Sequence, residues 1–187
     1  MDIQEKIVFA IQNSLTFEHI FDPSGVMEYG SYYITKERGK PLVDKNDIHD
    51  KRTGNIFTGY KRSIYKEAKF DSKQEKLLAD ILDNDPEVIR WLRNPATKSG
   101  ISIKYKFGNY YPDLVAETQD ITYVLEVKSS DALHDVDVLE KAREGISWCN
   151  KMTKVTGKPW KYGIVPHDRF ARNDSFRMVI SQIIAIN

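Results

Sequence analysis

Three charged residues in the middle of the chain have the types and spacing that metal-assisted chemistry requires. Asp113 follows Pro112, and Glu126 and Lys128 lie two positions apart. Carboxylate oxygens are preferred ligands of Mg²⁺, which keeps several waters that can take part in a reaction. An ammonium group beside them can orient or help deprotonate a metal-bound water and offset charge developing on a phosphate. The three residues therefore predict hydrolysis of a phosphodiester.

Two neighbouring strands would have to bring these residues together. Side chains alternate along a strand, so Glu126 and Lys128 should share a face with Val124. If a hairpin joins the two segments through a loop of two residues (118–119) or four (117–120), Asp113 lies opposite Val124 and diagonal to Glu126. That diagonal is about 7–8 Å between backbone positions, close enough for two carboxylates to share an ion. An odd loop length would place them on opposite faces.

The residues around these charges are mostly apolar, which bears on whether the charges form a site. Burying two carboxylates and an ammonium without partners costs several kcal/mol for each group. Two adjacent carboxylates also repel, which raises the proton affinity of one. A bound cation relieves both effects. The alternative is a surface hairpin with ordinary solvent-facing charges. Val124, on the same face, favours partial burial and therefore a site.

Glu75 is a fourth candidate, near the start of a predicted helix. Residues 72–75, Ser-Lys-Gln-Glu, have the form of a capping box. Leu78 and Leu82 belong to the apolar face of the same helix, and Glu75 borders this face. Two interpretations of Glu75 stay open with equal weight, namely participation in catalysis and capping of the helix alone.

The elements that would hold these residues follow from periodicity and turn signals. The N-terminal part predicts a helix over 3–20, short strands and loops over 25–59, and a strand pair or irregular connector over 56–65. The rest predicts helices over 72–82, 87–92, 135–154 and 176–186, with strands over 101–107, 111–116, 121–127 and 160–165. This order predicts an α/β fold in which a mixed sheet is flanked by helices.

Composition narrows the class of protein. The 187 residues are 41% hydrophobic and 29% charged, as in globular proteins, and the single cysteine excludes an intrachain disulfide. The sequence shows neither a membrane span nor a secretory signal, so we expect a cytoplasmic protein without membrane contact. The formal net charge of +1 weakens an interpretation as a general nucleic-acid binder. It does not exclude DNA contact through a local basic patch.

Several basic residues are candidates for contacts with DNA phosphates. They are Lys104, Lys106, Lys141 and Arg143, with Arg90 and Arg93 as further possibilities. Lys104 and Lys106 alternate on one predicted strand face and are suited to follow a DNA backbone. Lys141 and Arg143 lie two positions apart on a predicted helix and point to different sides. A solvated helix face is the commoner explanation for such a pair.

The segments that carry this chemistry resemble a known family. Pro112-Asp113 followed by Glu126-Val127-Lys128 resembles the PD-(D/E)xK nuclease signature. The resemblance to the C-terminal endonuclease domain of type III restriction enzyme restriction subunits, which are helicase–nuclease proteins, covers about residues 56–187. The matching segments are 70–75, 85–93, 110–118, 125–128, 148–149 and 158–167. The implied fold is restriction-endonuclease-like, with an αβββαβ core.

The resemblance also implies a site and a substrate. The implied catalytic residues are Asp113, Glu126, Lys128 and Glu75, and the implied metal set is Asp113, Glu126, Val127 and Glu75. The implied cofactor is Mg²⁺, for which Mn²⁺ can substitute, and the implied substrate is double-stranded DNA. Residues 1–65 would be a lead-in or linker region, and residues 66–187 the nuclease domain.

The sequence departs from whole restriction subunits in one respect. Those subunits carry an ATP-driven helicase, whereas this chain has no G-x-x-x-x-G-K-[ST] phosphate loop, so we expect no ATP site. The chain is then either a fragment or a stand-alone nuclease whose helicase or translocase part and methyltransferase subunit lie elsewhere. One alternative is a catalytically silent DNA-binding or docking module. Another is a hydrolase of RNA or of a small molecule on the same fold.

Overall fold

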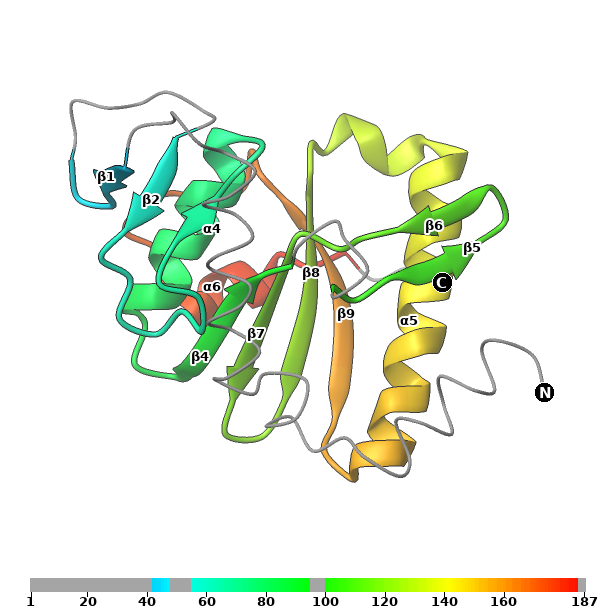
Figure 1. Ribbon diagram of the computed structural model, residues 1–187. Helices are drawn as coiled ribbons and strands as arrows, with labels where there is room; N and C mark the ends of the chain where they lie inside the picture. The colour runs from blue at the N-terminus through cyan, green and yellow to red at the C-terminus, as the bar shows by residue number, and fades with distance from the viewer. Residues whose placement is uncertain (1–41, 48–54, 95–99, 185–187) are drawn as a thin grey trace.

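The fold is a mixed α/β arrangement of three helices and three sheets among the described residues (Figure 1). The computed structural model describes residues 42–47, 55–94 and 100–184. The helix predicted over 3–20 lies outside this part of the chain. Within it, no helix is long and apolar enough to span a lipid bilayer.

The central sheet has four strands in the order β4-β7-β8-β9. Its strands are β4 (Val88–Arg93), β7 (Leu114–Thr118), β8 (Thr122–Lys128) and β9 (Trp160–Pro166). β7 is antiparallel to β4 and β8, whereas β9 is parallel to β8. Parallel neighbours require a long crossover, which the helix α5 (Val136–Thr156) provides. The prediction of a mixed sheet flanked by helices is thus confirmed.

The helices cover the two faces of this sheet. Leu114 and Leu125 belong to an apolar cluster with α4 (Lys73–Asn84) and α6 (Phe176–Ser181). Residues next to them in the strands, such as Val124, pack instead against α5. Alternation along each strand therefore divides the core into two halves.

The two longer helices begin and end where local chemistry predicts. Ser72 caps α4 by accepting a hydrogen bond from the backbone N–H of Glu75 at 3.1 Å. Asp135 caps α5, which ends at Gly157 in the left-handed conformation (φ +71°). α6 ends at Ser181, so residues 182–184 of the helix predicted over 176–186 are not helical, and residues 185–186 lie outside the described part of the chain.

The prediction of a helix over 87–92 is wrong, because this segment is strand β4. Its run of six residues is too short for periodicity to separate a strand from a helix. Val88 and Trp91 are residue types favoured in strands, and antiparallel pairing with β7 satisfies the backbone. Tertiary pairing decides the state of this segment.

The strand predicted over 101–107 does not join the central sheet. It forms β5 (Ile103–Tyr105), whose one partner among the described strands is β6 (Gly108–Tyr110), in a separate hairpin. β4 takes the place of the first sheet strand. β7 also begins at Leu114, three residues later than the predicted 111. The predicted strands 121–127 and 160–165 correspond closely to β8 and β9.

A small N-terminal sheet packs on α4. Its strands are β1 (Leu42–Asp44), β2 (Ile56–Thr58) and β3 (Ala68–Lys69). Val43, Phe57 and Ala68 share the apolar cluster of α4. The described parts of 25–59 are thus short strands and loops as predicted, and 59–65 is an irregular connector with one isolated bridge.

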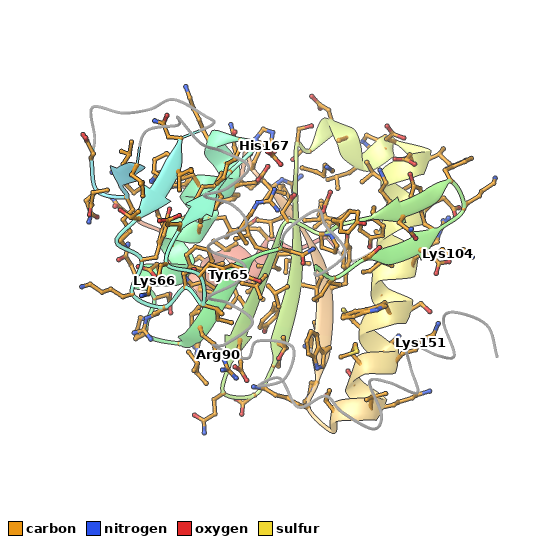
Figure 2. All side chains as sticks on the ribbon, viewed as in Figure 1. Tyr65, Lys66, Arg90, Lys104, Lys151 and His167 are labelled. Carbon is orange, nitrogen blue, oxygen red and sulfur yellow. The ribbon has the colours of Figure 1, made fainter. Side chains whose placement is uncertain are left out.

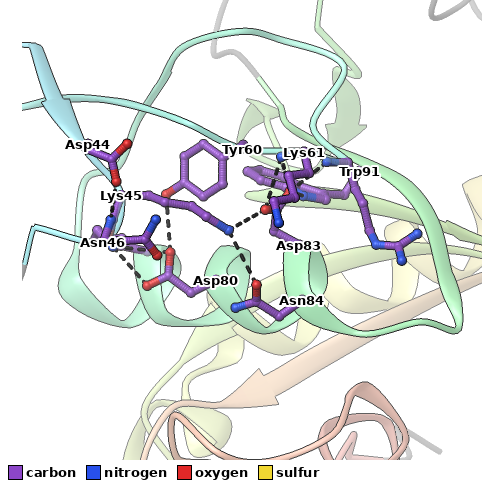
Figure 3. Close-up of polar contacts among 11 residues, drawn as sticks. Asp44, Lys45, Asn46, Tyr60, Lys61, Asp80, Asp83, Asn84 and Trp91 are labelled. Carbon is purple, nitrogen blue, oxygen red and sulfur yellow. Dashed lines mark hydrogen bonds and ion pairs between the residues drawn. The ribbon is translucent and has the colours of Figure 1, made fainter.

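Asp83 at the end of α4 holds the connector and β1 in place (Figure 3). Its carboxylate accepts hydrogen bonds from the backbone N–H groups of Lys61 and Arg62 at 2.9 and 2.7 Å and from Trp91 Nε1 at 3.1 Å. It also forms a buried ion pair with Lys45. Burial would raise the pKa of Asp83, but the bond from Lys45 and the backbone donors lower it. One ionised carboxylate therefore joins segments that are distant in the sequence.

Candidate active site

The turn between β7 and β8 fixes the register of the candidate residues. The Thr118 N–H donates to the Ile121 carbonyl at 2.9 Å, which makes Gln119 and Asp120 the two residues of the turn. Val124 therefore pairs with Val115. The predicted register, in which Asp113 lies opposite Val124, is wrong, because the turn lies one residue further along the chain than the predicted loops. The loop length is even, as the argument for a shared face requires.

Asp113 lies beside Glu126 just before β7 begins. Its backbone N–H donates to the Leu125 carbonyl at 3.0 Å, and its carboxylate Oδ2 accepts from the Val127 N–H at 2.8 Å. Backbone and side chain of Asp113 thus bond to both sequence neighbours of Glu126. The structure therefore places the backbone of Asp113 next to that of Glu126, and the charge of Glu126 acts on the Asp113 carboxylate.

Glu126 and Lys128 complete the group from β8. Lys128 Nζ lies 2.8 Å from Glu126 Oε1, and the Lys128 side chain is 34% exposed. Glu126 is buried, and its Oε2 has no hydrogen-bond partner among the described residues. Burial would lower the pKa of Lys128, but the carboxylates of Glu126, Asp113 and Glu75 raise it. Lys128 is therefore protonated at neutral pH.

The electrostatics of Asp113 show that the two acids influence each other. Burial, followed by the neighbouring charge of Glu126, raises the pKa of Asp113 to about 6. Arg93, the Val127 N–H and Lys128 act in the opposite direction. A carboxylate with this pKa is less stable in its ionised form than an exposed one. A cation placed between the two acids would stabilise the ionised form of Asp113.

Glu75 reaches the same region from the first turn of α4 and also caps that helix. Its carboxylate accepts bonds from Ser72 Oγ at 3.0 Å and from the Asp71 N–H at 3.2 Å. Burial, and then the charge of Asp113, raises the pKa of Glu75. The two interpretations of Glu75 left open by the sequence are thus compatible, because a capping residue also lies within electrostatic reach of Asp113.

Arg93 at the end of β4 lies among the acids of the site, whereas the sequence suggested it as a contact for DNA. Its Nη2 lies 3.1 Å from Glu75 Oε2 and 4.0 Å from Asp113 Oδ1. Its Nη1 donates to the Asp113 carbonyl at 2.8 Å, and the residue is only 8% exposed. Arg93 is therefore an internal partner of the acids and not a surface contact for DNA. Assigning 87–92 to a strand, which pairs Arg93 with Leu114, would have placed it beside Asp113.

A divalent cation at this site would have two acids as candidate ligands and not a larger set. In the described ranges, no group of three or more His, Cys, Asp or Glu side chains is arranged to hold a metal ion. Glu75 is instead bonded to Arg93. Mg²⁺ is commonly held by one or two carboxylates together with waters and substrate phosphates. Asp113 and Glu126, with the unbonded Oε2, suit that mode.

Two tyrosines, Tyr110 and Tyr162, form a wall between Glu126 and α5, and Gly145 of α5 packs against them. Tyr110 donates its hydroxyl to the Lys141 carbonyl at 2.7 Å. A Cβ at Gly145 would lie 2.5 Å from Tyr162 Cδ2 and 2.6 Å from Tyr110 Oη, so only glycine leaves room for both rings. Glu126 contributes to raising the pKa of both tyrosines, after the larger effect of burial. Sequence reasoning missed this wall, because the residues come from three separate elements.

The candidate DNA contacts fall into two groups. Lys104 and Lys106 are exposed on the β5–β6 hairpin. Lys141 and Arg143 lie on α5, where they pair with Asp137 at 2.5 Å and Glu140 at 2.9 Å. A further candidate, Arg90, pairs with Glu117 at 2.6 Å. The hairpin lysines thus differ from these three candidates, whose charges are offset by neighbouring acids.

Comparison with known proteins gives no match. No family model, curated protein or solved structure matches this chain. Its function must therefore be argued from the site itself.

Proposed function

We propose that this chain is a Mg²⁺-dependent DNA endonuclease domain. The observation that carries the proposal is the grouping of Asp113, Glu126 and Lys128. Asp113 bonds to the backbone on both sides of Glu126, and Lys128 Nζ lies 2.8 Å from Glu126 Oε1. A buried acid and a half-buried acid beside an ammonium are suited to phosphodiester hydrolysis.

The arrangement of elements supports a restriction-endonuclease-like fold. The order α4, β4, β7, β8, α5, β9 is the αβββαβ order that the resemblance implies, once the β5–β6 hairpin is treated as an insertion. Asp113 immediately precedes the second of these strands, and Glu126 and Lys128 end the third. This relation matches the Pro-Asp and Glu-x-Lys segments of the nuclease signature.

Each residue has a role that its surroundings suit. Asp113 and Glu126 would hold Mg²⁺, which when bound polarises the phosphate and activates water. Lys128 carries a raised pKa and remains cationic, so it would offset the charge developing on the phosphate and orient the attacking water. Arg93 holds Glu75 and the backbone at Asp113 in position. Tyr162 and Tyr110 wall off the α5 side of Glu126.

The biological setting that we propose is restriction of foreign DNA. Type III restriction subunits couple such a nuclease to an ATP-dependent helicase, and a methyltransferase subunit supplies sequence choice. We propose that the present chain works with partners of both kinds, with Mn²⁺ able to replace Mg²⁺. The division into a lead-in region over 1–65 and a nuclease domain over 66–187 remains part of this proposal.

A catalytically silent DNA-binding or docking module is the second candidate. The observation that favours it is the position of Arg93, whose guanidinium lies 3.1 Å from Glu75 and 4.0 Å from Asp113. An internal cation can offset part of the acidic charge without a metal. The two candidates differ in what Asp113→Ala does. A nuclease loses cleavage, whereas a silent module keeps or strengthens its DNA binding.

A plasmid-nicking assay tests the proposal. Supercoiled DNA is incubated with the protein in Mg²⁺, Mn²⁺ or EDTA, alone and with a helicase partner. We expect metal-dependent nicking that Asp113→Ala and Lys128→Ala abolish, and that the surface variant Lys161→Ala leaves unchanged. DNA binding without nicking under every condition would establish the silent module. Cleavage that requires a 2′-hydroxyl would indicate an RNA substrate.

A further inference from the structure

The β5–β6 hairpin carries a large exposed apolar side chain at its tip. Tyr105 pairs with Gly108, so Lys106 and Phe107 form the two-residue turn. Phe107 is 63% exposed. Turns of this length favour Asn, Asp and Gly, and the positive φ falls at Gly108 (+143°). Turn geometry therefore gives no reason for an aromatic residue at position 107.

The hairpin is supported so that its tip keeps its position. Tyr110 donates to the Lys141 carbonyl of α5 at 2.7 Å, and Lys141 Nζ lies 5.1 Å from the centre of the Tyr105 ring. Tyr105 packs edge-on against both Tyr110 and Phe107, with ring centres 5.8 and 6.0 Å apart. Phe107 is thus the outer end of an aromatic series that is anchored on α5.

Basic side chains accompany the exposed ring. Lys104 and Lys106 are both exposed, and Lys106 Nζ lies 5.1 Å from the centre of the Phe107 ring. Figure 1 shows the hairpin extending across the N-terminal half of α5, and Figure 2 shows Lys104 at the outer edge of the molecule. An apolar tip flanked by ammonium groups complements a polyanion with an apolar interior.

A short stretch of chain also connects the hairpin to the candidate active site. Asp113 follows the last residue of β6, Tyr110, by three positions. Three residues span at most about 10–11 Å. The base of the hairpin at Tyr110 therefore lies within this distance of Asp113, so a duplex held along the hairpin would extend to the two acids.

From these observations we infer that Phe107 is a wedge that enters a base-pair step of duplex DNA while Lys104 and Lys106 contact the flanking phosphates. Apolar side chains inserted between base steps partly unstack and kink the duplex. The wedge would position the scissile phosphate at Asp113 and Glu126. This inference rests on the proposed function, because it takes duplex DNA as the partner of the hairpin.

Fluorescence of 2-aminopurine in a duplex tests the wedge separately from cleavage. Binding is measured with Ca²⁺ in place of Mg²⁺, so that affinity and base unstacking are recorded without turnover. We expect the wild-type protein to raise the fluorescence at one step. Phe107→Ala should remove this rise and weaken binding about tenfold, whereas Phe107→Trp should retain both. Met178→Ala, which changes another exposed apolar side chain, is the matched control.

The lysine variants give an independent readout. Lys104→Ala and Lys106→Ala should each weaken binding and lower the slope of log affinity against log salt by about 1, without removing the fluorescence of the bound complex. The wedge is overturned if Phe107→Ala binds and unstacks DNA like the wild type, or if no unstacking accompanies binding. It is also overturned if Phe107→Ala instead abolishes self-association. Metal-dependent nicking that Phe107→Ala leaves intact would keep the nuclease proposal and reject the wedge alone.

Discussion

Lys128 and Glu126 form an ion pair along a single strand, with Lys128 Nζ 2.8 Å from Glu126 Oε1. Residues two apart on a strand share a face, so β8 alone provides both partners. The opposite oxygen of Glu126 is buried without a hydrogen bond among the described residues. One oxygen of this carboxylate is thus paired with the ammonium, and the other is a buried acceptor without a donor.

Replacement of Lys128 should separate catalysis from binding. We expect Lys128→Met to lower the rate of plasmid nicking by about 100-fold or more, because it removes a cation aimed at developing negative charge. Affinity for duplex DNA should change little. Nicking rates and fluorescence anisotropy measure the two effects. Lys161→Ala on the neighbouring strand is the control, and equal nicking by both variants would exclude a role for Lys128.

The raised pKa of Asp113 predicts a pH-dependent stability. In the folded state its pKa is about 6, compared with about 3.9 in an unfolded chain. The folded protein therefore binds this proton more tightly, and the free energy of unfolding falls as pH rises from about 4 to about 6. In metal-free buffer at pH 7.5, Asp113→Asn should be more stable than the wild type by about 1–3 kcal/mol. The gain should vanish at pH 4.

The effect of added metal on stability provides a second test of Asp113. Mg²⁺ should raise the melting temperature of the wild type at pH 7.5 and leave that of Asp113→Asn unchanged, because a ligand that binds only the folded state stabilises it. Thermal unfolding at both pH values with Mg²⁺ or EDTA provides the measurement. An equal metal effect on both proteins would contradict a cation at Asp113.

Loss of Arg93 should be costly because it leaves buried acids without their partner. We expect Arg93→Met to lower the free energy of unfolding by about 3–5 kcal/mol at pH 7. Glu75→Gln in the same chain should recover part of this loss, because it removes one unpaired charge. Urea unfolding of the two single variants and the double variant measures the coupling. Strict additivity would mean that Arg93 and Glu75 do not interact.

Asp83 should act as a stability centre far from the candidate active site. Asp83→Ala leaves the buried ammonium of Lys45 and several N–H donors without their acceptor, so we expect a loss of about 3–5 kcal/mol. The fluorescence of Trp91, whose indole N–H donates to Asp83, should report the change. Asp80→Ala is the control, because the Asp80–Lys76 pair is less buried.

Gly145 should tolerate no side chain. Gly145→Ala places a methyl group 2.5–2.6 Å from the Tyr162 ring and the Tyr110 hydroxyl, and we expect a loss of about 1–3 kcal/mol. If the wall positions Glu126, metal-dependent nicking should also fall at temperatures where the variant is folded. Lys151→Ala, an exposed change on the same helix (Figure 2), should affect neither property.

Local patterns in the sequence determined the ends of α4 and α5 and the identity of β8 and β9. Ser72 and Asp135 cap their helices through bonds to residues two or three positions away, so the necessary information lies within one turn. Alternation along β8 likewise places Glu126 and Lys128 on one face without reference to a partner strand. The charges of the candidate site were therefore visible in the sequence, together with their common face.

Only the tertiary structure decided which segments became neighbours. The segment 87–92 is compatible with a helix or a strand, and pairing with β7 selects the strand and carries Arg93 to the acids. The register of Asp113 depended on which residues form the turn, a choice that pairing along the whole hairpin makes. Gly145, Tyr110 and Tyr162 meet only when α5 folds over the sheet. These contacts join distant parts of the chain, so their free energy arises from packing that no local pattern encodes.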